Sequence, residues 1–306
     1  MSPNTPPESP AGRARVGYLG PEGTFSEEAL LAGAEPGAVE PIPLGTIYET
    51  VTALRDGRVG WAIVPIENSL EGSVTVTLDL LAGEPWDVRI VGETLLGVRH
   101  CLVAAEQVAL EEIATVLTHP QVPGQCERFL RAELPGVAVL PASSTAEAVR
   151  TVVREGRREQ AALGTLLAAE IYGGALIRAG VEDRGDNETR FVWLAREADS
   201  SVPAPLREIG GGELKTSLVF WGSGASRPGW LVRCLDEFAR RDINLTKIES
   251  RPRRERLGSY MFFVDLAGEP SEEPVGEAIA GVARMCEELR VLGYYRGAPF
   301  ARPTAA

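Results

Sequence analysis

The sequence has almost no lysine and almost no histidine. Among 306 residues, Lys215 and Lys247 are the only lysines, and His100 and His119 are the only histidines. Acidic residues outnumber basic ones by 43 to 31, which gives a formal net charge of −12. Because nucleic-acid binding draws on clustered Lys and Arg, this balance argues against a nucleic-acid partner. An anionic ligand would have to be bound by arginine, hydroxyl and amide groups and by helix N-termini.

Cysteine is scarce too, and its four residues are scattered without a C-x-x-C pair. Each lies in an apolar or helical context, which predicts buried free thiols rather than disulfides or structural zinc. Since the sequence has no clustered metal ligands, a metal site would need scattered acids, and we expect neither a metal nor a cofactor. The cysteines are Cys101, Cys126, Cys234 and Cys286.

Long apolar runs are missing. None approaches the roughly 18–20 residues that span a bilayer, and the first residues contain no stretch typical of a signal peptide. We therefore expect a cytoplasmic protein without a membrane partner. The Pro-, Ser- and Gly-rich start predicts a disordered tail over residues 1–14.

What the sequence does contain is an alternation of strand-like and helix-like segments from Val16 to about Ala195, the order of an α/β domain. Hydroxyl residues followed three positions later by Glu or Gln predict four helix N-caps. These caps are Thr24, Thr46, Thr118 and Ser144. The expected strands are 16–19, 61–64 and 115–117, and the helices after them are 25–31, 74–81 and 126–130.

A chain of this length fits two domains. We place the first at 15–196 and a linker rich in Asp, Ser, Pro and Gly at 197–213. The segments that follow have the order strand, helix, strand, strand, helix, strand, which predicts a ferredoxin-like domain at 214–296. Val275, Ile279, Val282 and Cys286 mark its second helix, and residues 297–306 form a tail.

Five segments combine strand or helix ends with polar side chains. Taken singly, each has a structural explanation: a βα turn, an Asn/Ser turn, a Pro-rich loop with a structural His119, a helix cap, or a surface ion pair. The segments are GPEGTFSEEAL (20–30), VPIENSLEGSV (64–74), LTHPQVPGQCERFL (117–130), SSTAEAV (143–149) and DNETRFVWLA (186–195).

In this order, the five segments resemble the prephenate dehydratase family from Val16 to about Tyr295. The family's GxxGTFS, PIENS, HPQxxxQC, STA and TRF motifs stand at 20–26, 65–69, 119–126, 144–146 and 189–191. The resemblance implies a catalytic domain of two α/β lobes, similar to periplasmic binding proteins, with the active site in the cleft between them. It also implies a C-terminal ACT domain, a regulatory module that pairs with its copy in another subunit.

The resemblance further implies site residues. Catalytic roles fall on Thr189, Asn68 and Gln125, to which we add Thr118, where some family members have serine, and Glu67. The expected substrate-binding residues are Thr24, Ser26, Ser69, Ser144, Thr145, Arg190 and Phe191.

Effector contacts are expected in two segments of the ACT domain. The ESRP signature is intact at Glu249, Ser250, Arg251 and Pro252, and the family's PGAL stands as Pro228, Gly229, Trp230 and Leu231. Trp230 in place of Ala either fills the effector pocket or forms an aromatic wall of it. The resemblance thus predicts phenylalanine as allosteric effector and a homodimer or homotetramer.

Prephenate is a dianion that loses its ring carboxylate as CO2 and its ring hydroxyl as water. A site with few lysines suits this reaction, because a strong cation would stabilise the departing carboxylate. Since an alcohol is a weak acid, we expect Thr189 to donate a hydrogen bond to the leaving hydroxyl, with Glu67 as a possible proton source if burial raises its pKa. An arogenate dehydratase and a non-enzymatic amino-acid sensor are the alternatives.

Overall fold

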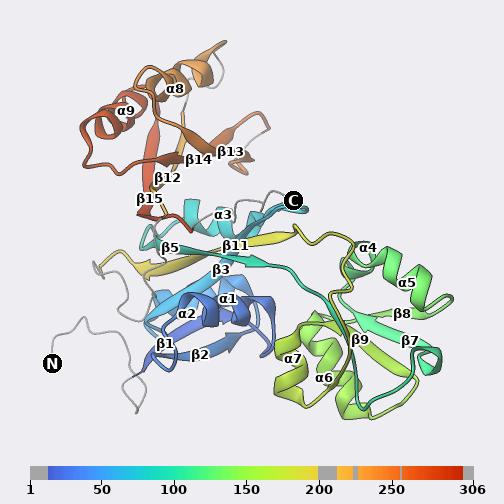
Figure 1. The fold of residues 1–306 in the computed structure, drawn as a ribbon. Coiled ribbons are helices and arrows are strands. Elements are labelled where there is room, and N and C mark those ends of the chain that lie inside the picture. Colours follow the sequence, from blue (N-terminus) through green and yellow to red (C-terminus); the bar gives the residue numbers. More distant parts are fainter. Residues whose placement is uncertain (1–12, 199–211, 223–226, 256, 299–306) are drawn as a thin grey trace. The chain divides into compact units, whose positions relative to one another are not determined.

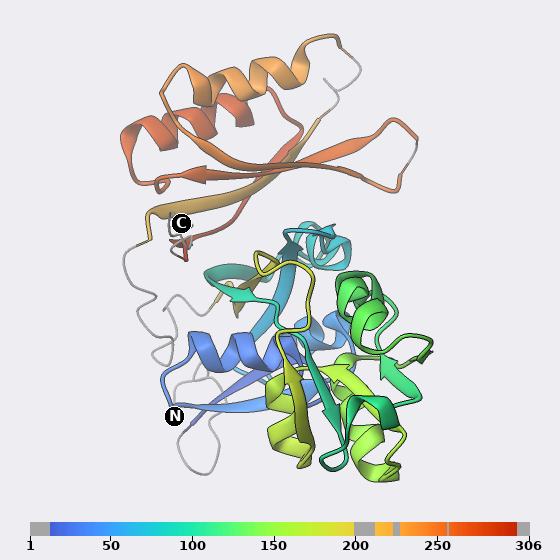
Figure 2. The same cartoon turned by 45° about the vertical axis from the view of Figure 1, so that its right-hand side comes forward.

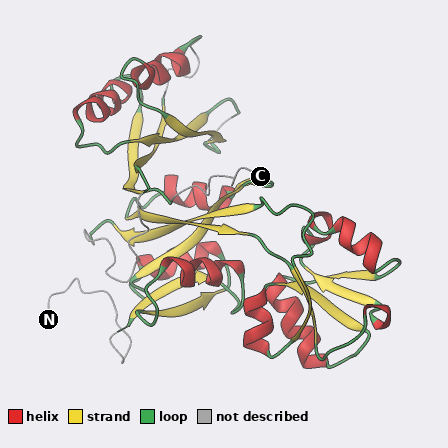
Figure 3. Ribbon diagram, in the orientation of Figure 1, coloured by secondary structure: helices red, strands yellow, loops and turns green. Residues whose placement is uncertain are grey.

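The computed structural model describes residues 13–198, 212–222, 227–255 and 257–298. Within these ranges, strands and helices are interspersed up to Arg196, and the order strand, helix, strand, strand, helix, strand follows (Figures 1 and 3). The α/β class and the ferredoxin-like order are therefore confirmed. Most of the predicted N-terminal tail, linker and C-terminal tail lies outside the described residues, although β1 already begins at Ala14. No helix in the described ranges is long and apolar enough to cross a membrane.

The first sheet has the strand order β2-β1-β3-β11-β5, with the short β4 paired to β3. β1 runs parallel to both β2 and β3. Tyr18 of β1 and Ile63 of β3 are fully buried, because helices connect parallel strands across the faces of the sheet. The elements are β1 (Ala14–Leu19), α1 (Phe25–Gly33), β2 (Val39–Leu44), α2 (Ile47–Arg55), β3 (Trp61–Asn68), β4 (Gly72–Ser73), α3 (Thr75–Ala82), β5 (Val88–Gly97) and β11 (Glu188–Arg196).

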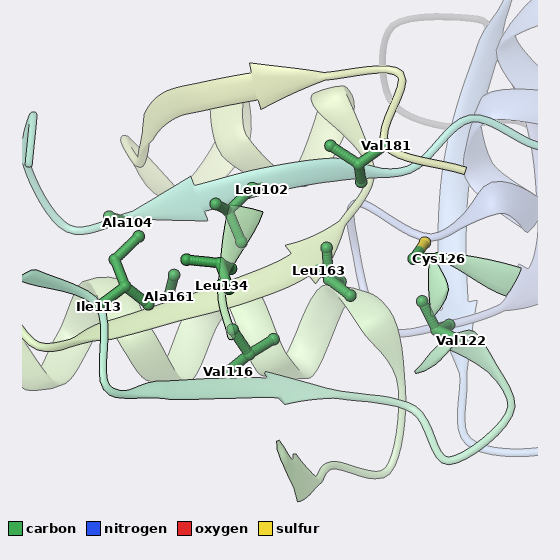
Figure 4. Close-up of a cluster of buried hydrophobic side chains, with 10 residues drawn as sticks. All are labelled: Leu102, Ala104, Ile113, Val116, Val122, Cys126, Leu134, Ala161, Leu163 and Val181. Atoms are coloured by element: carbon green, nitrogen blue, oxygen red, sulfur yellow. The ribbon is translucent and has the colours of Figure 1, made fainter. Parts of the chain in front are cut away.

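The second sheet has the order β10-β6-β9-β7-β8 and is covered on both faces. Successive residues of β6 point to opposite sides: Leu102 joins the core shown in Figure 4, and Val103 joins a second core with α6 and α7. The elements are β6 (Cys101–Ala104), the 3₁₀ helix η1 (Leu110–Glu112), β7 (Thr115–Thr118), α4 (Val122–Gln125), α5 (Glu127–Glu133), β8 (Ala138–Pro141), α6 (Thr145–Glu155), β9 (Gln160–Gly164), α7 (Leu166–Tyr172) and β10 (Ala175–Ala179).

Two of the four predicted side-chain caps form. Thr46 accepts the main-chain N–H of Glu49, and Ser144 accepts that of Glu147, each at 3.0 Å. Thr24 does occupy the N-cap of α1, but its hydroxyl donates to a main-chain carbonyl instead. Thr118 is not a cap at all, because it ends β7 and the helix α4 begins four residues later.

The C-terminal domain forms a sheet of order β13-β14-β12-β15, and α8 and α9 lie on the same face of it (Figure 2). Phe220, Phe238 and Val264 are buried between the helices and the sheet. The second helix ends at Ala283, so the prediction that it includes Cys286 was wrong. The elements are β12 (Leu214–Trp221), α8 (Trp230–Ala239), β13 (Leu245–Pro252), β14 (Tyr260–Ala267), α9 (Glu273–Ala283) and β15 (Glu288–Arg296).

The chain forms two compact units that do not follow the sequence order. One contains residues 5–78 and 94–191, and the other groups residues 79–93 with the chain from Val192 onward. Within the second unit, Lys215 Nζ lies 2.9 and 3.1 Å from the two carboxylate oxygens of Glu93. Both side chains are almost fully buried, so one of the protein's two lysines serves a buried ion pair.

Gly164 allows α6 to lie close to β9. A Cβ atom at Gly164 would come within 2.4 Å of Val149 Cγ2 and 3.1 Å of the Thr145 carbonyl oxygen. We expect Gly164→Ala to lower the free energy of unfolding by about 1–3 kcal/mol through overpacking. Chemical denaturation is the measurement, and Gly97→Ala is the matched control because nothing lies within 4 Å of that position. Equal stability of the two variants would contradict this packing.

Glu28 of α1 predicts a pH dependence of stability. Burial, with help from the carboxylates of Glu170 and Glu27, raises the pKa of Glu28 to about 7, although a hydrogen bond from the Leu167 N–H opposes the shift. Because this pKa is raised in the folded state, the contribution of Glu28 is fully present below about pH 4.5 and is lost as pH rises through 7.

We therefore expect Glu28→Gln to stabilise the protein relative to wild type more at pH 8 than at pH 5. Thermal unfolding at both pH values measures this difference. Glu111→Gln, at an exposed position, is the control for removing a surface charge. A Glu28→Gln difference that is the same at both pH values would rule out a raised pKa.

Candidate functional site

A cavity of about 920 Å³ lies where strand ends and helix starts of the first unit meet. Strands β1, β2 and β3 contribute their carboxyl ends, the usual ligand position in an α/β sheet. Helices α1, α3 and α6 begin at the cavity. Its lining is Leu19, Gly20, Pro21, Thr24, Phe25, Ser26, Pro43, Leu44, Gly45, Asn68, Glu71, Gly72, Ser73, Val74, Thr75, Val76, Val98, His100, His119, Gln121, Val122, Gln125, Ser143, Ser144, Thr145, Glu147, Asn187 and Thr189.

The residues that line this cavity include no lysine and no arginine. Two carboxylates, Glu71 and Glu147, are present instead, and Glu147 forms an ion pair with Arg150. An anionic ligand would therefore meet hydroxyl groups, side-chain amides and the main-chain N–H groups of helix first turns. The scarcity of lysine led us to expect these groups, but the arginine expected with them is not in the lining.

Asn68, at the end of β3, has both ends of its side-chain amide fixed. Its Oδ1 accepts the main-chain N–H groups of Leu70 and Glu71, each at 2.9 Å. Its Nδ2 donates to Asn187 Oδ1 at 2.9 Å and to Thr189 Oγ1 at 2.9 Å. Because the acceptor side is held by the backbone, the amide cannot turn over without losing the bonds from Leu70 and Glu71 and the bond to Asn187.

Thr189 lies at the start of β11 and is 9% exposed. Its Oγ1 accepts the hydrogen bond from Asn68, so the hydroxyl hydrogen is the part that remains to donate. The structure thus brings together two of the predicted catalytic residues, 121 positions apart in the sequence, and orients the hydroxyl as a donor.

Gln125, at the end of α4, also lines the cavity. Its Oε1 lies 3.0 Å from His100 Nε2 and 3.4 Å from Asn187 Nδ2, and its Nε2 lies 3.4 Å from a carboxylate oxygen of Glu71. His100, Asn187 and Glu71 were not among the site residues predicted from the sequence. Asn187 stands two positions before Thr189 in a segment that was selected, whereas nothing near His100 in the sequence marked it.

The predicted substrate-binding residues of the helix starts line the cavity as well. Thr24 and Ser26 belong to the start of α1, and Ser144 and Thr145 to the start of α6. The hydroxyl of Ser144 accepts the N–H of Glu147, which makes it a helix cap at the edge of the cavity.

The glycine turn before α1 has a packing reason. Gly23 has a φ of +81°, and a Cβ there would lie 2.8 Å from Ala168 Cα of α7. Its carbonyl accepts the Thr165 hydroxyl at 2.6 Å. The absence of a side chain at Gly23 therefore lets the turn before α1 contact the start of α7, which packs on the second sheet. The same turn holds Thr24 beside the cavity.

Five predicted site residues lie outside the lining. Glu67 forms an ion pair with Arg190, with Oε2 and Nη2 separated by 3.1 Å. Glu67 is not among the residues that line the cavity, which does not support the role of proton source. The hydroxyl of Thr118 is fully buried and donates to the Leu163 carbonyl at 2.9 Å, which indicates a structural role.

The remaining two have structural contacts. Phe191 is 2% exposed, within the core of the first sheet. Ser69 Oγ accepts the main-chain N–H of Glu188 at 3.0 Å and so ties the residue after Asn68 to the start of β11.

The two predicted effector segments occupy the end of β13 and the start of α8. Gly229 has a φ of +76°, follows Pro228 and directly precedes α8, which begins with Trp230 and Leu231. Trp230 is only 5% exposed and packs on Phe220 and Phe262, with ring centroids 6.0 and 5.9 Å apart.

The indole N–H of Trp230 donates to the Met285 carbonyl at 2.8 Å. Most of the Trp230 side chain is therefore part of the hydrophobic core of the domain and does not project into solvent. Of the ESRP residues, which are Glu249, Ser250, Arg251 and Pro252, the arginine makes a bidentate contact: Arg251 Nη2 lies 2.9 and 3.0 Å from the two oxygens of Asp79 on α3.

Two family models match the chain. The family model described as Prephenate dehydratase matches residues 16–199, and the ACT domain model matches residues 223–284. A prephenate dehydratase of Mycobacterium sp. (strain JLS) is 40% identical over 290 residues, covering 91% of this chain and 88% of that protein.

Two solved structures have closely similar folds. A prephenate dehydratase from Arthrobacter aurescens, solved in complex with L-Phe, has a TM-score of 0.80 and 35% identity, covering 93% of this chain and 90% of that one. A structure described as GqqA, of a novel type of quorum quenching acylases, has a TM-score of 0.82 and 30% identity, covering 94% and 100%. By sequence motifs, fold and similarity over most of its length, this chain belongs to the prephenate dehydratase family.

Proposed function

We propose that the protein is a prephenate dehydratase whose active site is the cavity lined by Asn68, Gln125 and Thr189. The observation that carries this site assignment is the hydrogen bond from Asn68 Nδ2 to Thr189 Oγ1, which leaves the threonine hydroxyl as a donor toward the cavity. The reaction requires a donor at the departing ring hydroxyl and no strong cation at the departing carboxylate.

In the reaction, the bond between the ring and its carboxylate breaks, and its electron pair forms the new π bond of the aromatic ring. The C–O bond to the ring hydroxyl breaks on the other side, and the leaving oxygen takes up a proton to become water. Thr189 would stabilise the negative charge on that oxygen as it develops. The carboxylate that remains on the pyruvyl side chain would be bound by Gln125 and by helix N-termini.

Two other activities, arogenate dehydration and acyl hydrolysis, can be compared with this geometry. Arogenate has an ammonium group in place of the keto group. Glu71 lines the cavity, and within the described residues no arginine or lysine is among its hydrogen-bond partners. Parallel kinetics on both substrates would show which is preferred.

An acylase, the activity printed for one structural relative, would need an activated nucleophile. In the described part of the cavity, His100 hydrogen-bonds to Gln125, and His119 accepts the N–H of Gln121, so neither is bonded to a hydroxyl.

Thr189→Val tests the catalytic hydroxyl. Valine has the shape of threonine without a donor, so we expect kcat for prephenate to fall by about 100-fold or more while the fold is kept. Thr189→Ser is the matched control, because it keeps the hydroxyl, and should keep most of the activity. Phenylpyruvate formation is the measurement. A valine variant within about threefold of wild type would remove Thr189 from the mechanism.

We also propose that phenylalanine regulates the enzyme through the ACT domain, in a homodimer or homotetramer. Supporting this proposal, Arg251 of the ESRP segment bonds Asp79 on α3, and the same helix begins with Thr75 and Val76 in the cavity lining. A ligand near Arg251 that changes this pair would act on the start of α3. Such an effect requires phenylalanine to bind one state better than the other.

Asp79→Asn should therefore weaken inhibition by phenylalanine. Because Asp79 is not among the residues that line the cavity, we expect turnover without phenylalanine to stay within about twofold, and the half-inhibitory concentration to change by about fivefold or more. Asp56→Asn, at an exposed ion pair with Arg58, is the control. If Asp79→Asn is inhibited by phenylalanine as strongly as wild type, the ion pair between Arg251 and Asp79 does not transmit the inhibition.

A further inference from the structure

A line of side-chain hydrogen bonds crosses the cavity wall from Asn68 to His100. Asn68 Nδ2 donates to Asn187 Oδ1 at 2.9 Å. Asn187 Nδ2 donates to Gln125 Oε1 at 3.4 Å, and His100 Nε2 lies 3.0 Å from the same oxygen. The side chains come from four separate segments of the chain, so tertiary packing alone brings them together.

The backbone determines the direction of each bond in this line. The N–H groups of Leu70 and Glu71 hold Asn68 Oδ1, so Asn68 must present its NH2 group to Asn187. Asn187 then presents its own NH2 group to Gln125, whose Oε1 must accept. A nitrogen facing an accepting oxygen has to carry a hydrogen, and therefore His100 is protonated at Nε2.

His100 is held firmly enough to act as a fixed donor. It is 1% exposed, its main-chain N–H donates to Glu182 Oε2 at 2.9 Å, and its carbonyl accepts the Val181 N–H at 3.0 Å. The ring of Phe25 meets the imidazole edge to face, with centroids 5.5 Å apart. Burial lowers the pKa of His100, which favours the neutral ring with its single N–H.

We propose that His100 and Asn187 are positioning residues that hold the Gln125 side chain with its oxygen toward the wall and its NH2 group on the substrate side, where it also lies 3.4 Å from a carboxylate oxygen of Glu71. This inference rests on the proposed function. The cavity lining has no lysine or arginine, so a dianion depends on such neutral donors. If the amide of Gln125 turned over, it would present an acceptor oxygen to a negatively charged substrate.

The prediction is that losing either partner of Gln125 weakens substrate binding more than it slows the chemical step. A carboxylate bound by Gln125 keeps its charge in the transition state, so this contact contributes to binding throughout the reaction. We expect His100→Leu to raise KM for prephenate about tenfold, with kcat changed less than about threefold. His100→Gln offers an N–H near the same point, so its KM for prephenate should lie close to the wild-type value.

Combining changes tests whether His100 acts through Gln125. In a Gln125→Ala background, His100→Leu should alter kcat/KM by less than about twofold, because the positioned group is already gone. Asn187→Asp is the second probe. It can still accept from Asn68 but cannot donate to Gln125, and we expect it too to raise KM in wild type and have little further effect in Gln125→Ala.

The outcomes separate the two proposals. A wild-type protein that does not turn over prephenate would refute the proposed function. An active wild type with unchanged KM in both His100→Leu and Asn187→Asp would overturn the positioning role alone. Equal losses of kcat/KM with and without Gln125 would mean that the two residues act independently of it. Thermal unfolding identifies a variant that fails to fold, in which case the other variant decides.

Discussion

The side-chain amide of Asn68 is the interaction on which the rest of the site depends. Two main-chain N–H groups of the turn after β3 hold its oxygen, and its nitrogen reaches the start of β11, about 120 positions later in the sequence. Because the backbone fixes the oxygen, the direction of every following hydrogen bond is decided as well. Thr189 accepts from Asn68 and keeps its hydroxyl hydrogen to donate. Asn187 likewise accepts from Asn68 and donates its own N–H to Gln125.

A second constraint is the lack of cations in the cavity. Binding a dianion with neutral groups places heavy demands on geometry, because each donor contributes little unless it is held in place. The fold meets this demand in two ways. Helices α1, α3 and α6 begin at the cavity, and the side-chain amides in the cavity wall are hydrogen-bonded to one another. Arg190, which was predicted to bind substrate, is instead paired with Glu67 outside the lining. The absence of a strong positive charge is consistent with a reaction that expels CO2.

The C-terminal domain uses its charged and aromatic residues mainly for structure. Lys215 is buried against Glu93, and Trp230 packs between Phe220 and Phe262. The contact of Arg251 with Asp79 is different in kind, because it joins the ESRP segment to a helix whose first residues line the cavity. Residues 79–93 belong to the compact unit that contains the C-terminal domain, although they lie within the part of the sequence that the prephenate dehydratase model matches.

The sequence by itself determined the α/β order, the ferredoxin-like order, the family and the positions of Asn68, Gln125 and Thr189. Apolar periodicity and local motifs report short-range structure, and five ordered motifs are specific. The caps at Thr46 and Ser144 were predictable for the same reason, since a cap involves residues three positions apart.

Only the tertiary structure decided which of these side chains face the cavity and what holds them. Thr118 was predicted as a catalytic residue from its place beside a motif, yet its hydroxyl bonds to Leu163 of a neighbouring strand. His100 and Asn187 gave no local signal for their contacts with Gln125, because their partners are 25 and 62 positions away. A hydrogen bond depends on distance and direction in space, and neither is encoded in the local pattern of the sequence.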